Sequence, residues 1–416
     1  MAYLNRVPEG ELTLRLASAG ALVIEGPKAC GKTATARRFA RSEVLLDVDA
    51  NARLAVDIDP SLILAGPTPR LIDEWQIAPP IWNHIRRAVD DRGLPGQFIL
   101  TGSAVPADDV VRHTGAGRLS RLRMRTMSLF ETGHANGSIS LRGVFGGSPA
   151  RAENTGITVG DLSERIVVGG WPGNLTNGVA QATRAVRDYL EETCRVDVRR
   201  VDDRVRDPAK VGRLLRSLAR NVATEATIAT LSIDAGGADG ALARDTVSNY
   251  ITALERLMIV EEQPAWSTHL RSKARIRSAP KRHFVDPSIA AAALRVTPDR
   301  LFADLNLFGL LFESLVVRDL RIYAQANDAT VLHYRDSTGL EVDAIVERAD
   351  GKWGAFEIKL GQGQVDAAAA SLLTFAERVD TSKCGAPSVL AVIVGTGYGY
   401  TRPDGVAVIP IGAFGP

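Results

Sequence analysis

Residues 21–33 read ALVIEGPKACGKT, a short apolar run followed directly by a glycine-rich turn. The turn matches the pattern G-x4-G-K-T, and the amphipathic stretch from Lys32 to Arg41 predicts that a helix follows it. Glycines let the N–H groups of such a loop point inward around phosphates, and the helix N-terminus adds positive charge. An ordinary glycine-rich turn does not need a strand before it and a helix after it, so the stretch predicts a phosphate-binding loop in an α/β domain.

The residue types in this loop assign roles toward a nucleotide. Lys32 is expected to contact the β- and γ-phosphates and to be catalytic, and the Thr33 hydroxyl is expected to ligate magnesium. ATP and Mg²⁺ are therefore the expected cofactors. The residues expected to bind the nucleotide here are Gly26, Pro27, Lys28, Ala29, Cys30, Gly31, Lys32, Thr33 and Ala34.

The run Leu71-Ile72-Asp73-Glu74 delivers two adjacent carboxylates at the expected end of a strand. Open α/β sheets bind their ligands at that end. We expect Asp73 to bind the nucleotide's Mg²⁺ and Glu74 to act as general base toward water. Two acids in a solvated turn would show the same letters, but their position after the phosphate loop favours the catalytic interpretation.

A third apolar run begins at Phe98 and ends in polar residues. Thr101 or Ser103 is expected to sense the γ-phosphate, although hydroxyls at strand ends also serve as simple caps. Four later arginines offer a cation for the transition state, and Arg118 is expected to contact the nucleotide. The sequence does not decide which of them acts, and each also fits a basic surface: Arg118, Arg121, Arg123 and Arg125.

Length and composition bound the class of protein. At 416 residues the chain exceeds one ordinary core, so two or three domains are expected. With 45% hydrophobic residues, 24% charged residues and a net charge of +2, the composition indicates a folded protein and does not by itself indicate a nucleic-acid binder. Three widely spaced cysteines fit a reducing compartment. The opening residues lack a long apolar core and no apolar run reaches membrane-spanning length, so we expect a cytoplasmic protein without a membrane partner.

Changes of periodicity predict three domains. Apolar runs that alternate with helices predict an α/β domain with the phosphate loop over 1–145, with a mostly parallel sheet and helices on both faces. Helical spacing over 157–300 predicts a helical or winged-helix domain, and a plain bundle would look similar. A long helix, three strands, a helix and a further strand predict a small mixed α/β domain over 301–416.

The motifs GPKACGKT, LIDEWQ, FILTGS and GAGR, in this order, resemble those of bacterial and archaeal AAA+-type ATPases that carry a helical or winged-helix middle and a restriction-nuclease-like C-terminal domain. Later phrases resemble the same family: GGWPGN at 169–174, KRHFVDPSI at 281–289, LFGLLFESLVVRDL at 307–320 and HYRDSTGLEVDAIVE at 333–347. The resemblance spans nearly the whole chain, and the family's biological role is largely undefined. It implies nucleotide chemistry at four residues: Lys32, Thr33, Asp73 and Glu74.

Four residues near the C-terminus form the constellation of a magnesium-dependent nuclease of the PD-(D/E)xK type: Glu313, Asp343, Glu357 and Lys359. Glu357 and Lys359 are two apart on an expected strand and so share a face, and Asp343 lies on the preceding strand. The three carboxylates would bind one or two Mg²⁺ or Mn²⁺ ions, and Asp343, Glu357 and Lys359 would be catalytic. Cross-strand salt bridges produce the same pattern, so an active nuclease and an inert nuclease-like fold both stay open.

Six basic residues between His269 and His283 suggest contact with DNA or RNA, although a solvated loop would look alike; they are Arg271, Lys273, Arg275, Arg277, Lys281 and Arg282. The first functional hypothesis is a magnesium-dependent ATPase that couples ATP hydrolysis to nucleic-acid binding or processing, with possible nuclease activity. The second is an ATP-dependent switch or scaffold with an inactive nuclease-like domain. A small-molecule kinase is a weaker third, because adjacent acids suit water activation better. A homo-oligomer fits each of the three.

Overall fold

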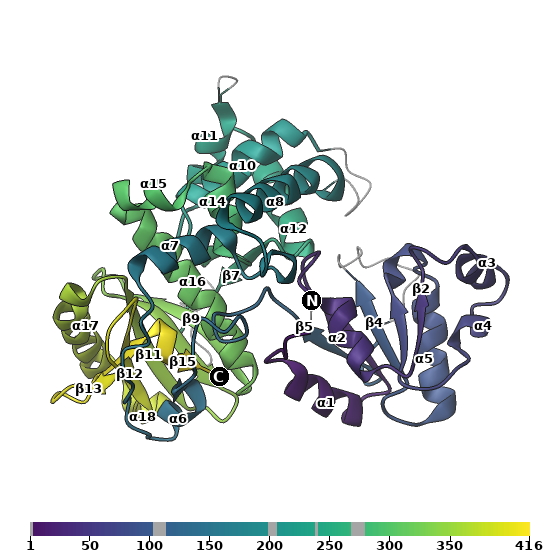
Figure 1. The fold of residues 1–416 in the computed structure, drawn as a ribbon, viewed down its shortest axis with the longest axis horizontal. Coiled ribbons are helices and arrows are strands. Elements are labelled where there is room, and N and C mark those ends of the chain that lie inside the picture. The colour runs from purple at the N-terminus through teal and green to yellow at the C-terminus, as the bar shows by residue number, and fades with distance from the viewer. Residues whose placement is uncertain (1–2, 103–113, 199–205, 238–239, 268–278) are drawn as a thin grey trace. The chain divides into compact units, whose positions relative to one another are not determined.

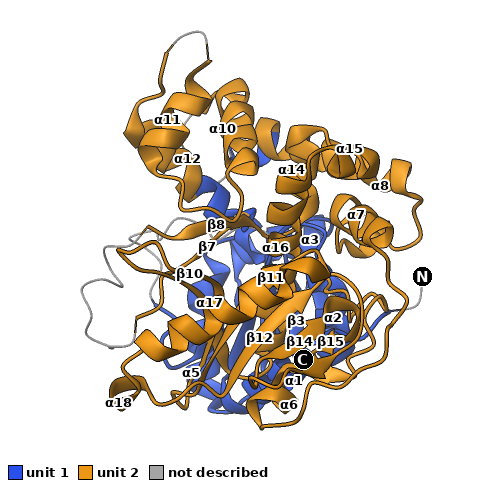
Figure 2. Cartoon of the chain, turned by 90° about the vertical axis from the view of Figure 1, so that its left-hand side faces the viewer, with its two compact units in different colours: residues 1–126, 196–205, 253–259 blue, residues 127–195, 206–252, 260–416 orange. Residues whose placement is uncertain are grey.

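The computed structural model describes residues 3–102, 114–198, 206–237, 240–267 and 279–416. The chain divides into two compact units (Figure 2). Unit 1 comprises residues 1–126, 196–205 and 253–259, and unit 2 comprises 127–195, 206–252 and 260–416. The helices among the described residues are all too short or too polar to span a lipid bilayer. The three domain boundaries expected from the sequence stay a prediction.

Unit 1 contains a five-stranded sheet in which neighbouring strands are parallel (Figure 1). Its order is β2-β3-β4-β1-β5, so β4 lies between the strand that leads into the phosphate loop and the strand that ends at Asp73. Because the carboxyl ends of parallel strands meet at one edge, the ends of β1, β3 and β4 lie close together. The strands are β1 (Ala21–Glu25), β2 (Ser42–Leu45), β3 (Arg70–Asp73), β4 (Phe98–Gly102) and β5 (Leu119–Arg123).

Helices cover both faces of this sheet, as the sequence predicted. Alternate residues of β1 belong to different core clusters: Ala21 and Val23 to one, Leu22 and Ile24 to the other. The cluster of Leu22 includes residues of α1 and α2, and the cluster of Ala21 includes residues of α3, α4 and α5. The helices are α1 (Glu9–Ser18), α2 (Lys32–Phe39), α3 (Ala50–Ile58), α4 (Ser61–Leu64) and α5 (Ile81–Arg92), with a 3-10 turn η1 (Trp75–Ile77).

Unit 2 begins with a largely helical region, again as predicted. Helix α10 packs against α11 and α14, and α14 also contacts α7 and α8. Strands β7 (Val260–Gln263) and β8 (Lys281–Phe284) pair antiparallel. This order fits both a winged helix and a plain bundle, so the winged helix stays a prediction. The helices are α6 (Leu141–Phe145), α7 (Val159–Val168), α8 (Val179–Glu192), α10 (Pro208–Arg220), α11 (Ile228–Gly236), α12 (Arg244–Arg256), α14 (Pro287–Leu294) and α15 (Pro298–Ala303), with short turns η2 (Pro172–Asn174) and η3 (Thr193–Asp197).

The C-terminal part of unit 2 contains a six-stranded mixed sheet of order β13-β14-β12-β11-β10-β9. Strands β9, β10 and β11 are antiparallel neighbours, whereas β11, β12 and β14 run parallel. The elements are α16 (Leu305–Gln325), β9 (Ala329–Arg335), β10 (Glu341–Arg348), β11 (Trp353–Lys359), η5 (Gln362–Gln364), α17 (Val365–Arg378), α18 (Thr381–Cys384), β12 (Val389–Val394), β13 (Tyr400–Thr401), β14 (Ala407–Pro410) and η6 (Ile411–Ala413), and β6 (Ile139–Ser140) pairs with β15 (Phe414–Gly415). The predicted element order is present, with extra strands at the C-terminal end, and the assignment to the nuclease fold stays a prediction.

Candidate functional site

The phosphate loop joins β1 to α2 and leaves no room for a side chain at its first glycine. A Cβ at Gly26 would lie 2.3 Å from the backbone oxygen of Met124, well inside van der Waals contact. Gly31, the N-cap of α2, has φ 103°, a left-handed conformation that glycine adopts at little cost. Both glycines of the motif are therefore required by the local backbone, and the N-terminus of α2 follows the loop directly.

Lys32 is folded onto the loop to which it belongs. Its Nζ donates hydrogen bonds to the carbonyl oxygens of Gly26 at 2.9 Å and Pro27 at 2.8 Å, and only 5% of the residue is exposed. Both acceptors are neutral. The ammonium is attracted more strongly to a negatively charged oxygen than to a neutral carbonyl, so phosphate oxygens would be better partners for this side chain.

Asp73 lies among hydroxyl groups at the carboxyl ends of the strands. Thr33 donates from Oγ1 to Oδ1 of Asp73 at 2.9 Å, and Thr101 donates to the same oxygen. The sheet register brings them together, because Asp73 is opposite Thr101 and Thr101 is opposite Ile24 of β1. Carboxylate and hydroxyl oxygens are the ligands that Mg²⁺ prefers. Thr33 and Asp73 therefore fit a magnesium ion bound together with a nucleotide.

Glu74 follows β3 in a left-handed backbone conformation, with φ 52° and ψ 43°. This conformation is uncommon for a residue with a Cβ, and such residues cluster at functional sites. Burial raises the pKa of the Glu74 carboxyl, while the hydrogen bond from the Gln76 amide and the charge of Lys32 act in the opposite direction. A raised pKa makes the carboxylate a stronger proton acceptor, as a general base requires.

Two contacts to the loop were missed by sequence reasoning. Arg6, which is 6% exposed, donates to the carbonyl of Cys30 at 2.8 Å and to the carbonyl of Arg125 at 2.9 Å. Lys28, expected to bind the nucleotide, pairs with Asp197 at 2.5 Å between Nζ and Oδ1. Neither Arg6 nor Asp197 stands in a motif or near the loop in the chain, so the sequence carries no signal for them.

The candidate arginines are already engaged. Arg118 pairs with Asp90 of α5 at 2.8 Å between Nε and Oδ1. Arg121 pairs with Glu25 at the end of β1, and its guanidinium carbon lies 5.5 Å from the centre of the Trp82 ring. Arg123 and Arg125 have interactions as well. These contacts do not single out one arginine as the cation, and Ser103 lies outside the described residues.

The four residues predicted for a C-terminal site lie in one buried ion cluster that also contains Lys281. Lys281 of β8 pairs with Glu313 of α16 at 2.8 Å and with Asp343 of β10 at 3.6 Å. Lys359 pairs with Asp343 at 3.0 Å and with Glu357 at 2.6 Å. Each of the three carboxylates therefore has an ammonium partner inside the protein.

Burial governs protonation in this ion cluster. It raises the pKa of Glu313 to about 7 and that of Glu357 to about 8, and the charge of Asp343 adds to both rises. Burial also opposes ionisation of Asp343, but Lys281, Lys359 and the backbone N–H of Ile358 at 2.9 Å leave its pKa lowered. Asp343 is thus the anion that the lysines stabilise, whereas both glutamates are held closer to neutral.

The ion cluster does not fit a metal ion as it stands. Within the described ranges, no three His, Cys, Asp or Glu side chains are arranged to hold one. The lysine ammonium groups bind the carboxylate oxygens that a cation would need. The roles of Glu313, Asp343 and Glu357 as metal ligands stay a prediction, and the alternative of internal salt bridges accounts for the geometry.

The predicted nucleic-acid segment is described only in part. Arg271, Lys273, Arg275 and Arg277 lie outside the described residues. Of the other two, Lys281 is 4% exposed in the ion cluster, and Arg282 pairs with Glu262 at 2.9 Å. The described members of this segment therefore bind partners within the protein.

Three family matches together cover most of the chain. Residues 18–133 match an AAA domain, residues 159–300 match a domain of unknown function (DUF8612), and residues 308–414 match a second one (DUF4143). The N-terminal region is an AAA-type P-loop domain. The two other matches carry no activity with them.

Two mycobacterial proteins resemble most of the chain. The uncharacterized proteins Mb2031c of Mycobacterium bovis and Rv2008c of Mycobacterium tuberculosis are each 27% identical over 372 residues, which is 85% of this chain and 74% of the relative. Among solved structures, the Walker-type ATPase PABY2304 of Pyrococcus abyssi aligns with a TM-score of 0.44 and 12% identity, over 70% of this chain and 96% of that chain.

Proposed function

We propose that this protein is a magnesium-dependent ATP hydrolase whose reaction takes place at the loop from Gly26 to Thr33. The observation that carries the proposal is that Lys32, the Thr33–Asp73 hydrogen bond and Glu74 lie at the carboxyl edge of one parallel sheet. The AAA domain match over residues 18–133 supports the same function.

Nucleotide binding exchanges partners within the loop. The Lys32 ammonium leaves the carbonyls of Gly26 and Pro27 and binds β- and γ-phosphate oxygens, which are charged. Backbone N–H groups of the loop and the N-terminus of α2 bind the remaining phosphate oxygens. Thr33 and Asp73 would hold Mg²⁺, which neutralises charge on the phosphates.

Hydrolysis then needs an activated water in line with the γ-phosphorus. The Glu74 carboxylate accepts a proton from this water as the oxygen bonds to phosphorus, and the bond from phosphorus to the bridging oxygen breaks to give ADP and phosphate. Gln76 orients the carboxylate through its amide. Thr101 donates to Asp73, so we propose that Thr101 senses the γ-phosphate and links it to the magnesium ligand Asp73.

The direct test is phosphate release from ATP by the wild type and by Lys32→Ala and Glu74→Gln. We expect hydrolysis in the wild type and at least about a hundredfold loss in each variant. Lys383→Ala is a suitable control, because Lys383 is an exposed lysine that pairs with Asp380 in unit 2. Equal phosphate release by all four proteins would refute the proposal.

We further propose that hydrolysis is coupled to DNA or RNA. The measurement is ATP turnover with and without added nucleic acid, and stimulation is the expected result. The second candidate, a nucleotide-dependent switch or scaffold, is favoured by one observation: the C-terminal ion cluster is neutralised internally, as an inert domain would be. A switch would bind ATP but turn it over at a rate that nucleic acid does not change.

A separate assay addresses nuclease activity in the C-terminal region. The purified chain is incubated with single- and double-stranded DNA and RNA in Mg²⁺ or Mn²⁺, beside Asp343→Ala and Glu357→Ala. Cleavage that both variants lose would assign nuclease activity to the ion cluster. Absence of cleavage in the wild type is the result that the internal salt bridges favour.

A further inference from the structure

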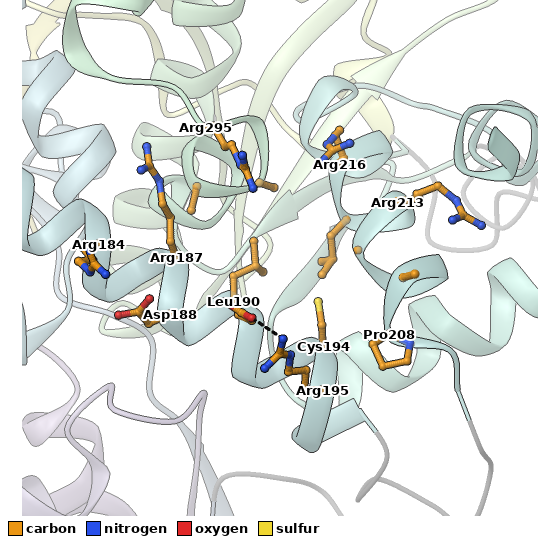
Figure 3. Close-up of a pocket in the computed structure, with 16 residues that line it drawn as sticks. Arg184, Arg187, Asp188, Leu190, Cys194, Arg195, Pro208, Arg213, Arg216 and Arg295 are labelled. Atoms are coloured by element: carbon orange, nitrogen blue, oxygen red, sulfur yellow. Dashed lines mark ion pairs between the residues drawn. The ribbon is translucent and has the colours of Figure 1, made fainter. Parts of the chain in front are cut away.

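A pocket of about 660 Å³ opens among the helices of unit 2 (Figure 3). It is lined by residues of α8, η3 and α10 and by the end of α14, all within the region that matches DUF8612. This volume lies in the usual range for ligand sites. The lining is rich in one residue type, with six arginines: Arg184, Arg187, Arg195, Arg213, Arg216 and Arg295.

Most of this positive charge is not neutralised within the described residues. Among the described residues, only two acids, Asp188 and Glu191, line the pocket, and Glu191 pairs with Arg195 at 2.9 Å. The Nε of Arg213 donates to the carbonyl of Ala235. Five of the lining arginines have no ion-pair partner in the described part of the chain, and four of these five are exposed: Arg184, Arg187, Arg216 and Arg295.

Such a lining suits phosphate groups. Guanidinium groups around one hollow repel each other, and an anion between them relieves this repulsion. The planar fork of arginine matches two phosphate oxygens at once, a geometry that lysine does not provide. Leu190, Leu215 and Ala292 contribute apolar surface, but no aromatic side chain in the described ranges lines the pocket. Stacking of nucleobases on aromatic rings of these residues is therefore not available, and the charge of the lining suits phosphate groups.

The exposure of the arginines favours an extended polymer with many phosphates over a small molecule as the ligand of this pocket. Small-molecule sites usually bury most of the ligand and hold it with a few placed polar groups. Here the four exposed arginines lie on α8, on α10 and directly after α14. Figure 3 labels all four among the residues that line the pocket. An open hollow with charges on several sides fits a ligand that carries phosphates in a row and continues beyond the pocket.

We propose that this arginine pocket binds the phosphodiester backbone of a nucleic-acid strand. The proposal rests on the proposed coupling to DNA or RNA and gives that partner a site within unit 2. Binding at the pocket does not require ATP hydrolysis, so the test is run without nucleotide. A failure of the pocket can then be distinguished from a failure of the ATP site.

The test is fluorescence anisotropy of a labelled single-stranded oligonucleotide with the full chain, between about 50 and 200 mM salt. The pocket variant is Arg184→Ala/Arg187→Ala/Arg216→Ala, and alanine is compatible with helix at all three positions. The matched control, Arg142→Ala/Arg151→Ala/Arg220→Ala, removes the same charge from exposed arginines of unit 2 outside the pocket lining. Arg220 lies one turn after Arg216 on α10, which makes the comparison local.

We expect the pocket variant to bind at least about tenfold more weakly at physiological salt, and its salt dependence to flatten by about 0.7 in log–log slope for each lost phosphate contact. The control should keep the affinity and slope of the wild type. Circular dichroism and thermal unfolding check that both variants are folded. Equal losses in the two triple variants, or pyrophosphate binding as tight as the oligonucleotide, would overturn the proposal.

Discussion

The proposed nucleotide site and the C-terminal ion cluster both contain lysines and carboxylates, but the partners of these side chains differ. In the nucleotide site, Lys32 donates to two neutral carbonyls, and Asp73 accepts from two hydroxyls. In the ion cluster, Lys281 and Lys359 bridge three carboxylates. Charges held by neutral partners can exchange them for a charged ligand at little cost, whereas opening a buried ion pair is expensive. Whether the charged side chains have neutral or charged partners, more than their residue type, therefore decides whether a site can accept a charged ligand.

The largest effect is expected from Lys32→Ala. Losing the ammonium removes the contact to the transferring phosphate, so ATP turnover should fall by about 10²–10³-fold. The carbonyls of Gly26 and Pro27 that Lys32 binds lie in the loop itself, and water can replace their partner. Thermal unfolding should therefore change little. Loss of activity together with loss of folding would mean that Lys32 stabilises the fold, as the lysines of the ion cluster do.

A smaller kinetic effect is expected from Glu74→Gln. The amide keeps the shape of the side chain but accepts no proton, so kcat should fall by about 10²-fold while ATP still binds. Because burial raises the pKa of Glu74, wild-type kcat should fall as the pH drops through that pKa and the base is protonated. A pH–rate profile in the acidic range, measured beside the variant, checks both statements. A variant that loses binding and turnover equally would contradict the general-base role.

In the ion cluster the expected effect is on stability. Lys281→Met leaves Glu313 and Asp343 buried without this cation, which should cost about 3 kcal/mol of unfolding free energy. Urea unfolding measures this difference. Adding Glu313→Gln to the variant should restore part of the loss, because it removes one of the unpaired carboxylates. If Lys281→Met left the free energy of unfolding unchanged, the cluster would be open to water and ions.

The last prediction concerns a pH dependence of stability at Glu357. Burial raises its pKa to about 8 from 4.5, so the folded protein keeps a proton that the unfolded chain releases between these values. The stability that this group contributes is complete below the lower value and is lost as the pH rises toward the upper one. Glu357→Gln cannot ionise, so its unfolding midpoint should rise relative to the wild type from about pH 5 to pH 9. Using the difference removes the opposite contribution of His333, whose pKa burial lowers to about 4.

The geometry of the proposed nucleotide site was predictable from sequence because it is local. The loop needs glycine where Met124 approaches and where φ is positive, and its lysine and threonine follow at once. The position of Asp73 beside Thr33 was predictable for a related reason, since strand ends collect at one edge of a parallel sheet. The AAA domain match agrees with this part of the interpretation.

The ion cluster and the arginine pocket depend on packing that no local pattern records. Sequence reasoning placed Lys281 in a nucleic-acid segment, but β8 pairs with β7 and brings Lys281 to Glu313 of α16. Composition does not say which arginines share a cavity. Only the packing of α8, α10 and α14 gathers those that line the pocket. Arg6 was missed for the same reason.

Triphosphate binding by the loop and Lys32 underlies every later step of the proposed reaction. Isothermal titration of the wild type with Mg-ATP, repeated with Lys32→Ala and with the control Lys383→Ala, tests this directly. Saturable heat should appear in the wild type and the control and be lost or strongly weakened in Lys32→Ala. Identical titrations for the wild type and Lys32→Ala, or no saturable heat in any of the three, would contradict it.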